Sequence, residues 1–259
     1  MEISMKLCFI VVLTWISMTQ VMGAKILAEK PSFLTICKRS DPEFGKCFAK
    51  NLQAAFFEWK SGVPGLKSIR SLDPLHFKRV TIKQGDQGNP ISINMELEKA
   101  ALAGLGGTAI DDVGSNGNTL DMKLKITIPS FKLTGDYKLQ GNILSLALNS
   151  QGKAVITFDN AVLILNVQFK LNERNGYEFA DVDKFHLDWI ENGGIQFHFD
   201  NLFNGDKALE DGALALLNAN WSTLFDVLRP SLSQTNQVVV KDIITKLFAY
   251  VPAKYLMEE

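Results

Sequence analysis

The sequence lacks most of the features on which an enzyme or a nucleic-acid-binding protein depends. Its 259 residues include only three cysteines and three histidines, and the formal net charge is −1. A charge this close to zero leaves no basic excess with which to hold nucleic acid or an anionic membrane. The HExxH, GxSxG, GxxxxGKS/T and GxGxxG patterns are all absent. We therefore expect no catalytic residues, no metal, no cofactor and no nucleic-acid partner.

Long apolar runs are also missing, except at the N-terminus. Lys6 precedes the apolar run 7–13, and Val21 and Gly23 stand at positions −3 and −1 of a cleavage site before Ala24. This pattern predicts a signal peptide over residues 1–23, too short to span a bilayer comfortably. The alternative is an uncleaved N-terminal anchor. We expect residues 24–259 to be one secreted, extracellular domain without stable membrane insertion.

Cysteine is scarce in the mature chain, where only Cys37 and Cys47 remain after Cys8 leaves with the signal peptide. Two cysteines in an exported chain are predicted to pair. The short loop that they close corresponds to about 2–3 kcal/mol in the chain-entropy account. Metal binding is the poorer alternative, since two thiols and scattered histidines do not form a tetrahedral set.

Hydrophobic periodicity predicts a helix, then many strands, then helices. The first helix is expected to start at Ser40 as the N-cap, with Pro42 in its first turn, and to end at Gly62-Val63-Pro64-Gly65. A second helical stripe runs over 214–228, is expected to kink or end at Pro230, and is followed by a helix that stops before Pro252.

Between these helices the apolar period is two, which predicts strands. The clearest run is 120–128, and Phe131 and Leu133 continue it after Pro129 shifts the phase, so an edge or bulge is expected there. Further strands are expected around Leu144–Leu148, Val155–Phe158, Val162–Leu171, Tyr177–Trp189 and Ile195–Phe199. The expected turns are Gly135-Asp136, Gly141-Asn142, Gln151-Gly152, Asn175-Gly176 and Asn192-Gly193-Gly194.

This element order defines the expected fold class as α+β. Short turns between consecutive strands require an antiparallel meander. A sheet this long has to curl, and the long helices with apolar stripes are available to cover its apolar face. Two local motifs are weaker. Gly104-Leu105-Gly106-Gly107 is interpreted as a turn or flexible loop rather than a phosphate loop, and Asn220-Trp221-Ser222 matches the N-glycosylation triplet.

Four motifs in register along the mature chain resemble those of insect takeout-like proteins, relatives of the juvenile-hormone-binding proteins. They are Cys37-Lys38-Arg39-Ser40-Asp41-Pro42 with Cys47, Gly62-Val63-Pro64 with Ser71-Leu72-Asp73-Pro74-Leu75, Ile128-Pro129 with Gly135-Asp136-Tyr137-Lys138-Leu139-Gln140-Gly141, and Asn218-Ala219-Asn220-Trp221 with Leu228-Arg229-Pro230. Hormone-binding relatives often have a second disulfide, which this chain lacks. That difference places it nearer the takeout branch and makes juvenile hormone itself a less secure ligand.

The resemblance implies a long helix wrapped by a highly curved antiparallel sheet that encloses an apolar tunnel. It also implies an extracellular carrier of a terpenoid, juvenile-hormone-like or fatty acyl compound, linked to circadian, feeding or behavioural regulation. The expected partner is a hydrophobic small molecule bound by a monomer, and any receptor would be a further partner that the sequence does not identify. The alternatives are an interaction protein with a filled core and, less favoured, a secreted hydrolase of lipid esters.

The sequence has 17 phenylalanines against four tyrosines and four tryptophans, so much apolar aromatic surface must be buried or face a ligand. Strand and helix phase select the residues expected to line the tunnel. These are Phe56, Leu124, Ile126, Phe131, Leu133, Leu148, Phe158, Phe197, Phe199, Leu217, Trp221 and Phe225. Tyr137, Tyr177 and Trp189 are the candidates to donate a hydrogen bond to the ligand.

Overall fold

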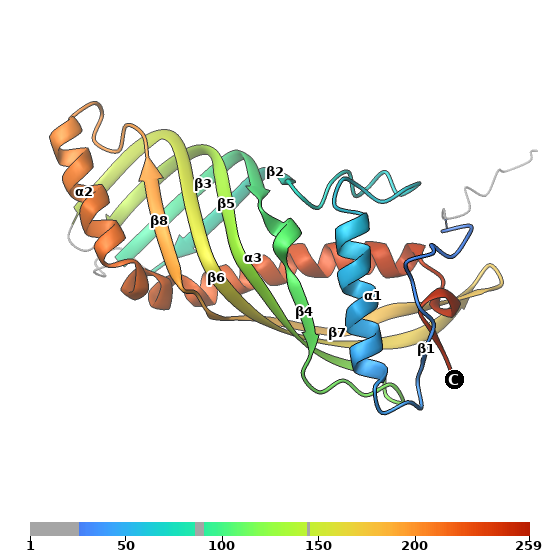
Figure 1. Ribbon diagram of the computed structural model, residues 1–259. Helices are drawn as coiled ribbons and strands as arrows, with labels where there is room; N and C mark the ends of the chain where they lie inside the picture. Colours follow the sequence, from blue (N-terminus) through green and yellow to red (C-terminus); the bar gives the residue numbers. More distant parts are fainter. Residues whose placement is uncertain (1–25, 86–90, 144–145) are drawn as a thin grey trace, which may run out of the picture.

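The computed structural model describes residues 26–85, 91–143 and 146–259, in which a single large sheet curls around a long helix (Figure 1). The predicted signal peptide lies outside the described residues. The elements are β1 (Cys37–Lys38), α1 (Phe44–Glu58), β2 (Leu75–Gln84), β3 (Ile91–Ala103), the 3₁₀ turn η1 (Leu105–Gly107), β4 (Ala109–Asp112), β5 (Asp121–Ile143), β6 (Leu146–Arg174), β7 (Tyr177–Glu191), β8 (Gly194–Phe199), α2 (Lys207–Ala219), α3 (Trp221–Tyr250), η2 (Ala253–Tyr255) and β9 (Met257–Glu258).

The large sheet is antiparallel and runs in the order β2-β3-β5-β6-β7, with β4 also paired to β5 and β8 to β6. It does not close into a barrel, because β2 and β7 remain its two ends. Figure 1 shows α3 lying along the concave side, with α1 near one end and α2 at the other. The predicted α+β class, a long helix wrapped by a curved antiparallel sheet, is confirmed. Within the described residues, no helix combines the length and apolarity needed to cross a membrane.

Strands β5 and β6 both change their pairing partners at the same level of the sheet, close to Pro129. On one side of β5 the ladder to β4 stops at Thr127 and the ladder to β3 begins at Lys132. β6 likewise leaves β8 at Asp159 and meets β7 from Val162. The buried face of β5 moves from even positions before Pro129 to odd positions after it, as the alternation predicted. Pro129, which has no N–H to donate, occupies the interval without a partner on that side.

Three of the expected turns are wrong, because Gly135, Gly141 and Gly152 lie inside continuous strands. Gly141 has φ +137°, and a Cβ there would collide with the carbonyl oxygen of Ser92 on the neighbouring strand. These glycines therefore allow close backbone approach in a strongly coiled sheet rather than chain reversal. Asn175-Gly176 does form the β6–β7 turn, and residues 192–193 separate β7 from β8.

The helix boundaries also differ from the prediction. α1 begins at Phe44, because Asp41 accepts the N–H groups of Glu43 on its side chain (2.8 Å) and of Phe44 on its carbonyl (3.0 Å). α3 continues through Pro230, and the break between helices is at Asn220 instead. Pro230 lies on the exposed face of α3, where water can satisfy the carbonyl group left without a donor.

The lead-in to α1 is fixed by a disulfide and an asparagine. Cys37 and Cys47 are joined, with 5.8 Å between their Cα atoms. Asn51 is buried, accepts the N–H of Thr35 on Oδ1 (2.8 Å) and donates from Nδ2 to the Thr35 carbonyl (2.6 Å). α1 is therefore held to β1, which itself pairs in parallel with β9 near the C-terminus.

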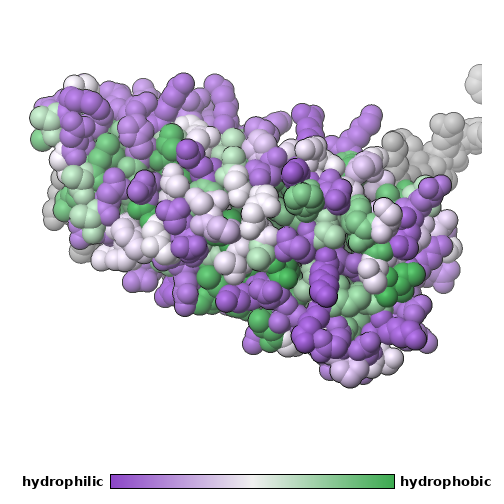
Figure 2. Space-filling model, in the orientation of Figure 1, coloured by the Kyte–Doolittle hydropathy of each residue, from purple (hydrophilic) through white to green (hydrophobic). Residues whose placement is uncertain are grey.

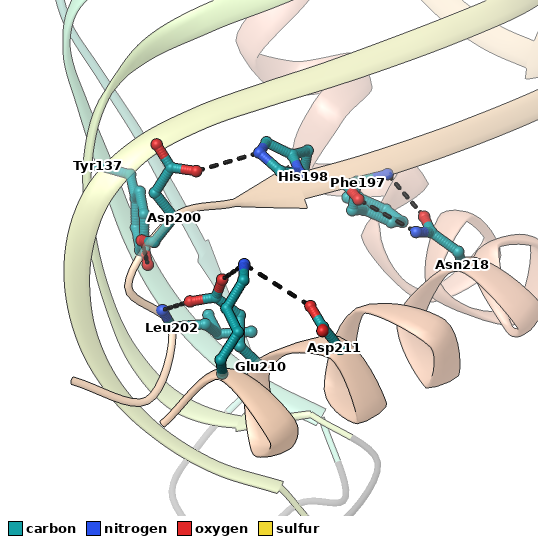
Figure 3. A network of polar contacts seen from close by, with 9 residues as sticks. Tyr137, Phe197, His198, Asp200, Leu202, Glu210, Asp211 and Asn218 are labelled. Atoms are coloured by element: carbon teal, nitrogen blue, oxygen red, sulfur yellow. Dashed lines mark hydrogen bonds and ion pairs between the residues drawn. The ribbon is translucent and has the colours of Figure 1, made fainter. Parts of the chain in front are cut away.

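α2 is attached to the sheet by polar contacts that Figure 3 shows from close by. Asn218 accepts the N–H of Phe197 on Oδ1 (2.7 Å) and donates from Nδ2 to the Phe197 carbonyl (3.1 Å), so its amide pairs with β8 as a strand would. The buried carboxylate of Glu210 accepts the N–H of Leu202 (3.0 Å) and pairs with Lys207 (2.6 Å). These contacts hold α2 across one end of the curved sheet.

We expect the attachment of α2 to weaken in acid. The hydrogen bond from the Lys207 ammonium, aided by the N–H of Leu202, holds the pKa of Glu210 below its ordinary value. A lowered folded-state pKa stabilises the fold above the ordinary carboxyl pKa, and that stabilisation is lost as the pH falls through the folded value. In urea unfolding, Glu210→Gln should therefore lower the midpoint at pH 7, and this difference should shrink as the pH is lowered toward about 3.

Asp211→Asn is the matched control for this experiment. Asp211 is exposed and its carboxylate lies 3.7 Å from the same Lys207 ammonium. Its replacement should leave the midpoint nearly unchanged at both pH values, because exposed ion pairs contribute little. A Glu210→Gln deficit that stays constant from pH 7 to pH 3 would show that the carboxylate charge does not anchor α2.

Candidate functional site

The candidate site is an internal cavity of about 280 Å³ between the concave face of the sheet, α1 and α3. This volume is close to the lower end of the roughly 300–1,000 Å³ typical of small-molecule sites. Its wall is almost entirely apolar. Among the described lining residues, Thr108, Thr235 and Asn236 have polar side chains, and Trp59 and Trp189 add indole N–H groups. No Lys, Arg, His, Asp or Glu belongs to the lining that the described residues form.

α3 closes the side of the cavity that the sheet leaves open. The Ser231 hydroxyl donates to the carbonyl of Lys83 on β2 (3.1 Å). On the other edge, the N–H groups of Trp189 and Leu187 on β7 donate to Ser233 Oγ (3.0 Å) and Gln237 Oε1 (3.2 Å). Both end strands of the sheet, β2 and β7, are thus hydrogen-bonded to α3. The face of α3 between these contacts lines the cavity.

Two aromatic clusters lie along the interior of the tube. Phe131 and Phe158 stack with ring centroids 4.7 Å apart, Trp189 packs 5.4 Å from Phe158, and Phe225 lies behind Trp189 at 5.5 Å. The first three residues line the cavity and Phe225 does not. This cluster sits at the level of Pro129, where the sheet changes partners, and so bounds the cavity on the side of α2.

The second cluster contains Phe44, Phe48, Phe169 and Phe248, drawn from α1, β6 and α3. Their ring centroids are 4.5–6.1 Å apart along the cluster. None of the four lines the cavity, although Leu52, one helical turn after Phe48, does. Phenylalanine thus both fills the core near α1 and forms the wall near Pro129.

The structure brings six of the twelve predicted lining residues together around the cavity. They are Phe56, Leu124, Ile126, Phe131, Leu133 and Phe158. The other six, which do not line this cavity, pack in the same hydrophobic core. They are Leu148, Phe197, Phe199, Leu217, Trp221 and Phe225. The periodicity of a strand or helix predicts which side chains face the interior, but it does not predict where along the length of the curved sheet each one lies.

The aromatic donors expected at the site have other partners. The Tyr137 hydroxyl donates to the carbonyl of Asp200 (2.8 Å), and burial raises the pKa of Tyr137. Trp189 lines the cavity, but its indole N–H donates to the Glu191 carbonyl (2.9 Å). Tyr177 does not line the cavity and lies under the Lys254 ammonium, 4.8 Å from the ring centroid. Most of the lining was not predicted from the sequence, including the whole α3 segment from Leu232 to Leu247. In that segment Asn236 is a polar interruption of the apolar stripe.

Two further motifs have a structural explanation. Asp73 accepts the N–H groups of Gly104 (2.9 Å) and Gly106 (2.7 Å), so these amides of the glycine-rich loop are already satisfied by a carboxylate. That contact places Leu105 in the cavity wall. Asn220 lies at the junction of α2 and α3, and its Nδ2 donates to the Leu216 carbonyl (2.8 Å). Glycosylation of Asn220 stays a prediction.

An α+β tube with a lengthwise helix and an apolar interior cavity defines a class of fold suited to holding a hydrophobic molecule. The model of the haemolymph juvenile hormone binding protein family matches residues 9–258. The chain belongs to that family, and the takeout-like resemblance inferred from its motifs is confirmed.

Individual relatives agree with this assignment. The circadian clock-controlled protein daywake of Drosophila melanogaster is 25% identical over 257 residues, which cover 95% of this chain and 96% of the relative. The daywake protein of Drosophila yakuba is 23% identical over 253 residues, covering 93% and 94%. The crystal structure of Takeout 1 from Epiphyas postvittana superposes with a TM-score of 0.73 at 22% identity, over 86% of this chain and 99% of that one. The structural match shows a shared fold.

Proposed function

We propose that the protein is a secreted, monomeric carrier that holds one hydrophobic small molecule, of terpenoid or fatty acyl type, in the cavity between α1, α3 and the sheet. The observation that carries the proposal is the cavity itself, about 280 Å³ with an almost wholly apolar wall. An interaction protein with a filled core would lack such a cavity. The described lining residues offer threonine hydroxyls but no serine, cysteine, histidine or carboxylate, and we propose binding without catalysis.

The energy of binding would come from removing the ligand chain from water. At about 0.8 kcal/mol for each buried CH₂, a chain of roughly fifteen carbons gains about 12 kcal/mol. Lost translational and rotational freedom costs at least about 4 kcal/mol. The remaining ~8 kcal/mol corresponds to a dissociation constant near micromolar.

Secretion is part of the same proposal. Residues 1–23 have the features of a cleaved signal peptide, and the Cys37–Cys47 disulfide suits an oxidising, extracellular compartment. We propose that residues 24–259 form the mature domain. Because the Drosophila relatives are named as clock-controlled, we also propose that expression of this protein follows a daily rhythm, which a transcript time course would test.

Displacement of a dye tests the carrier function. A naphthylamine dye whose fluorescence rises in apolar surroundings should bind the mature protein. Methyl laurate, a neutral fatty acyl ester, should displace it at micromolar concentrations. Dye that binds at one site and is displaced would support the carrier. A protein that takes up neither dye nor ester would contradict it and favour the interaction protein.

A further inference from the structure

The cavity-facing side of α3 carries a polar residue at its centre. Asn236 lines the cavity together with Leu232 four residues before it, and with Val239, Val240 and Ile243 three, four and seven residues after it. Helical periodicity places these positions on one face. Asn236 therefore lies in the middle of an apolar stripe rather than at its edge.

Four other polar residues of this part of α3 have a structural role. Ser231, Ser233 and Gln237 bond the edges of β2 and β7. The Thr235 hydroxyl donates to the Ser231 carbonyl (2.9 Å). For the half-buried side chain of Asn236, no hydrogen bond to another described residue is present.

The two threonines of the wall do not compete with Asn236 as donors. Thr108 donates its hydroxyl proton to the Leu105 carbonyl (2.6 Å). The Thr235 proton is likewise used within the helix. Trp59, just after α1, also lines the cavity, and its indole N–H has no hydrogen bond to another described residue. The amide of Asn236 is the donor on α3, with two N–H groups that it can offer to a bound molecule. It cannot satisfy them against the aliphatic neighbours that surround it.

The absence of charge in the described lining limits the ligand further. A carboxylate moved into an apolar wall without a cationic partner loses its hydration, and a single neutral amide does not replace it. A neutral carbonyl oxygen loses far less and accepts the N–H of Asn236 directly.

We propose, on the basis of the carrier function above, that Asn236 is a specificity-determining residue that selects neutral oxygenated lipids, an apolar chain with an ester or other carbonyl group, over hydrocarbons and fatty acid anions.

Three ligands of matched chain test this assignment: methyl laurate, tridecane and laurate at pH 8, where the carboxyl group is ionised. Each is titrated against the dye-loaded mature protein. Asn236→Leu should weaken methyl laurate binding by about five- to tenfold, the loss of one net hydrogen bond, while tridecane binding changes less than about twofold. In the unmodified protein, laurate should bind at least about tenfold more weakly than its methyl ester.

Gln234→Leu is the matched control, since it makes the same amide-to-leucine change on the exposed face of the same helix. It should leave all three affinities unchanged. Retained tridecane binding shows that Asn236→Leu is folded. If Asn236→Leu does not fold, Asn236→Ala, which adds no bulk, is tested in its place. Equal proportional effects of Asn236→Leu on ester and hydrocarbon, or laurate binding as tight as the ester, would overturn this inference while leaving the carrier intact. An unmodified protein that binds none of the three would overturn the carrier function and this inference with it.

Discussion

Val240→Trp is expected to weaken ligand binding by about a hundredfold. Val240 lines the cavity from α3 and remains partly accessible because it faces that space. An indole there would exclude about four methylene groups of the ligand, each contributing about 0.8 kcal/mol. The loss of about 3 kcal/mol corresponds to a factor of more than one hundred in affinity. Displacement of the dye by methyl laurate measures it.

Val238→Trp provides the control for bulk and for helix propensity. Val238 is two residues away on the outward face of α3, with 66% of its surface exposed. Its replacement should leave the affinity for methyl laurate unchanged. The face of the molecule in Figure 2 is mostly hydrophilic or neutral, with apolar side chains among polar ones. Equal affinities for Val240→Trp and the unmodified protein would place the ligand outside this cavity.

Phe48→Ala is expected to destabilise the protein by about 3–5 kcal/mol, the range for removing a buried aromatic ring. Phe48 has no exposed surface and contacts Phe44, Phe169 and Phe248 at centroid distances of 5.8, 6.1 and 6.0 Å. These contacts join α1 to β6 and α3, so a cavity there loosens three elements at once. Thermal unfolding should shift down by roughly 10 °C.

The comparison residue on the same helix is Phe57, which is 54% exposed and lies under the Lys60 ammonium. Phe57→Ala should cost no more than about 1 kcal/mol, since it removes a surface ring and one exposed cation–π contact. A loss for Phe48→Ala no larger than that for Phe57→Ala would show that the aromatic cluster does not hold α1 in place.

The sequence predicted the fold where a local signal matched the tertiary structure. The change of alternation across Pro129 predicted an edge or bulge, and β5 changes partners from β4 to β3 at that level. The turn predicted at Gly141 was wrong, because a glycine that permits close approach of two strands looks the same in the sequence as a glycine in a turn. The helix does not end at Pro230, which it exposes to water, whereas Asn220 ends α2 through a side-chain bond to Leu216.

The candidate site was only half predictable for a different reason. Alternation identifies side chains that face inward, and both Leu124 and Leu148 do so. Their positions along the tube depend on where Phe131, Phe158 and Trp189 meet across the interior, which is a long-range packing outcome. Asn236 was missed because one polar residue in a helical stripe is conspicuous only when the cavity it faces is known.

The central claim is that a hydrophobic molecule occupies this cavity, and native mass spectrometry of the secreted mature protein tests it most directly. The native mass is compared with the denatured mass and with a solvent extract of the same sample. We predict a discrete excess mass that disappears on denaturation, with a matching neutral lipid in the extract. An unliganded protein that also does not bind terpenoids or long-chain fatty acyl compounds added at micromolar concentrations would contradict the claim.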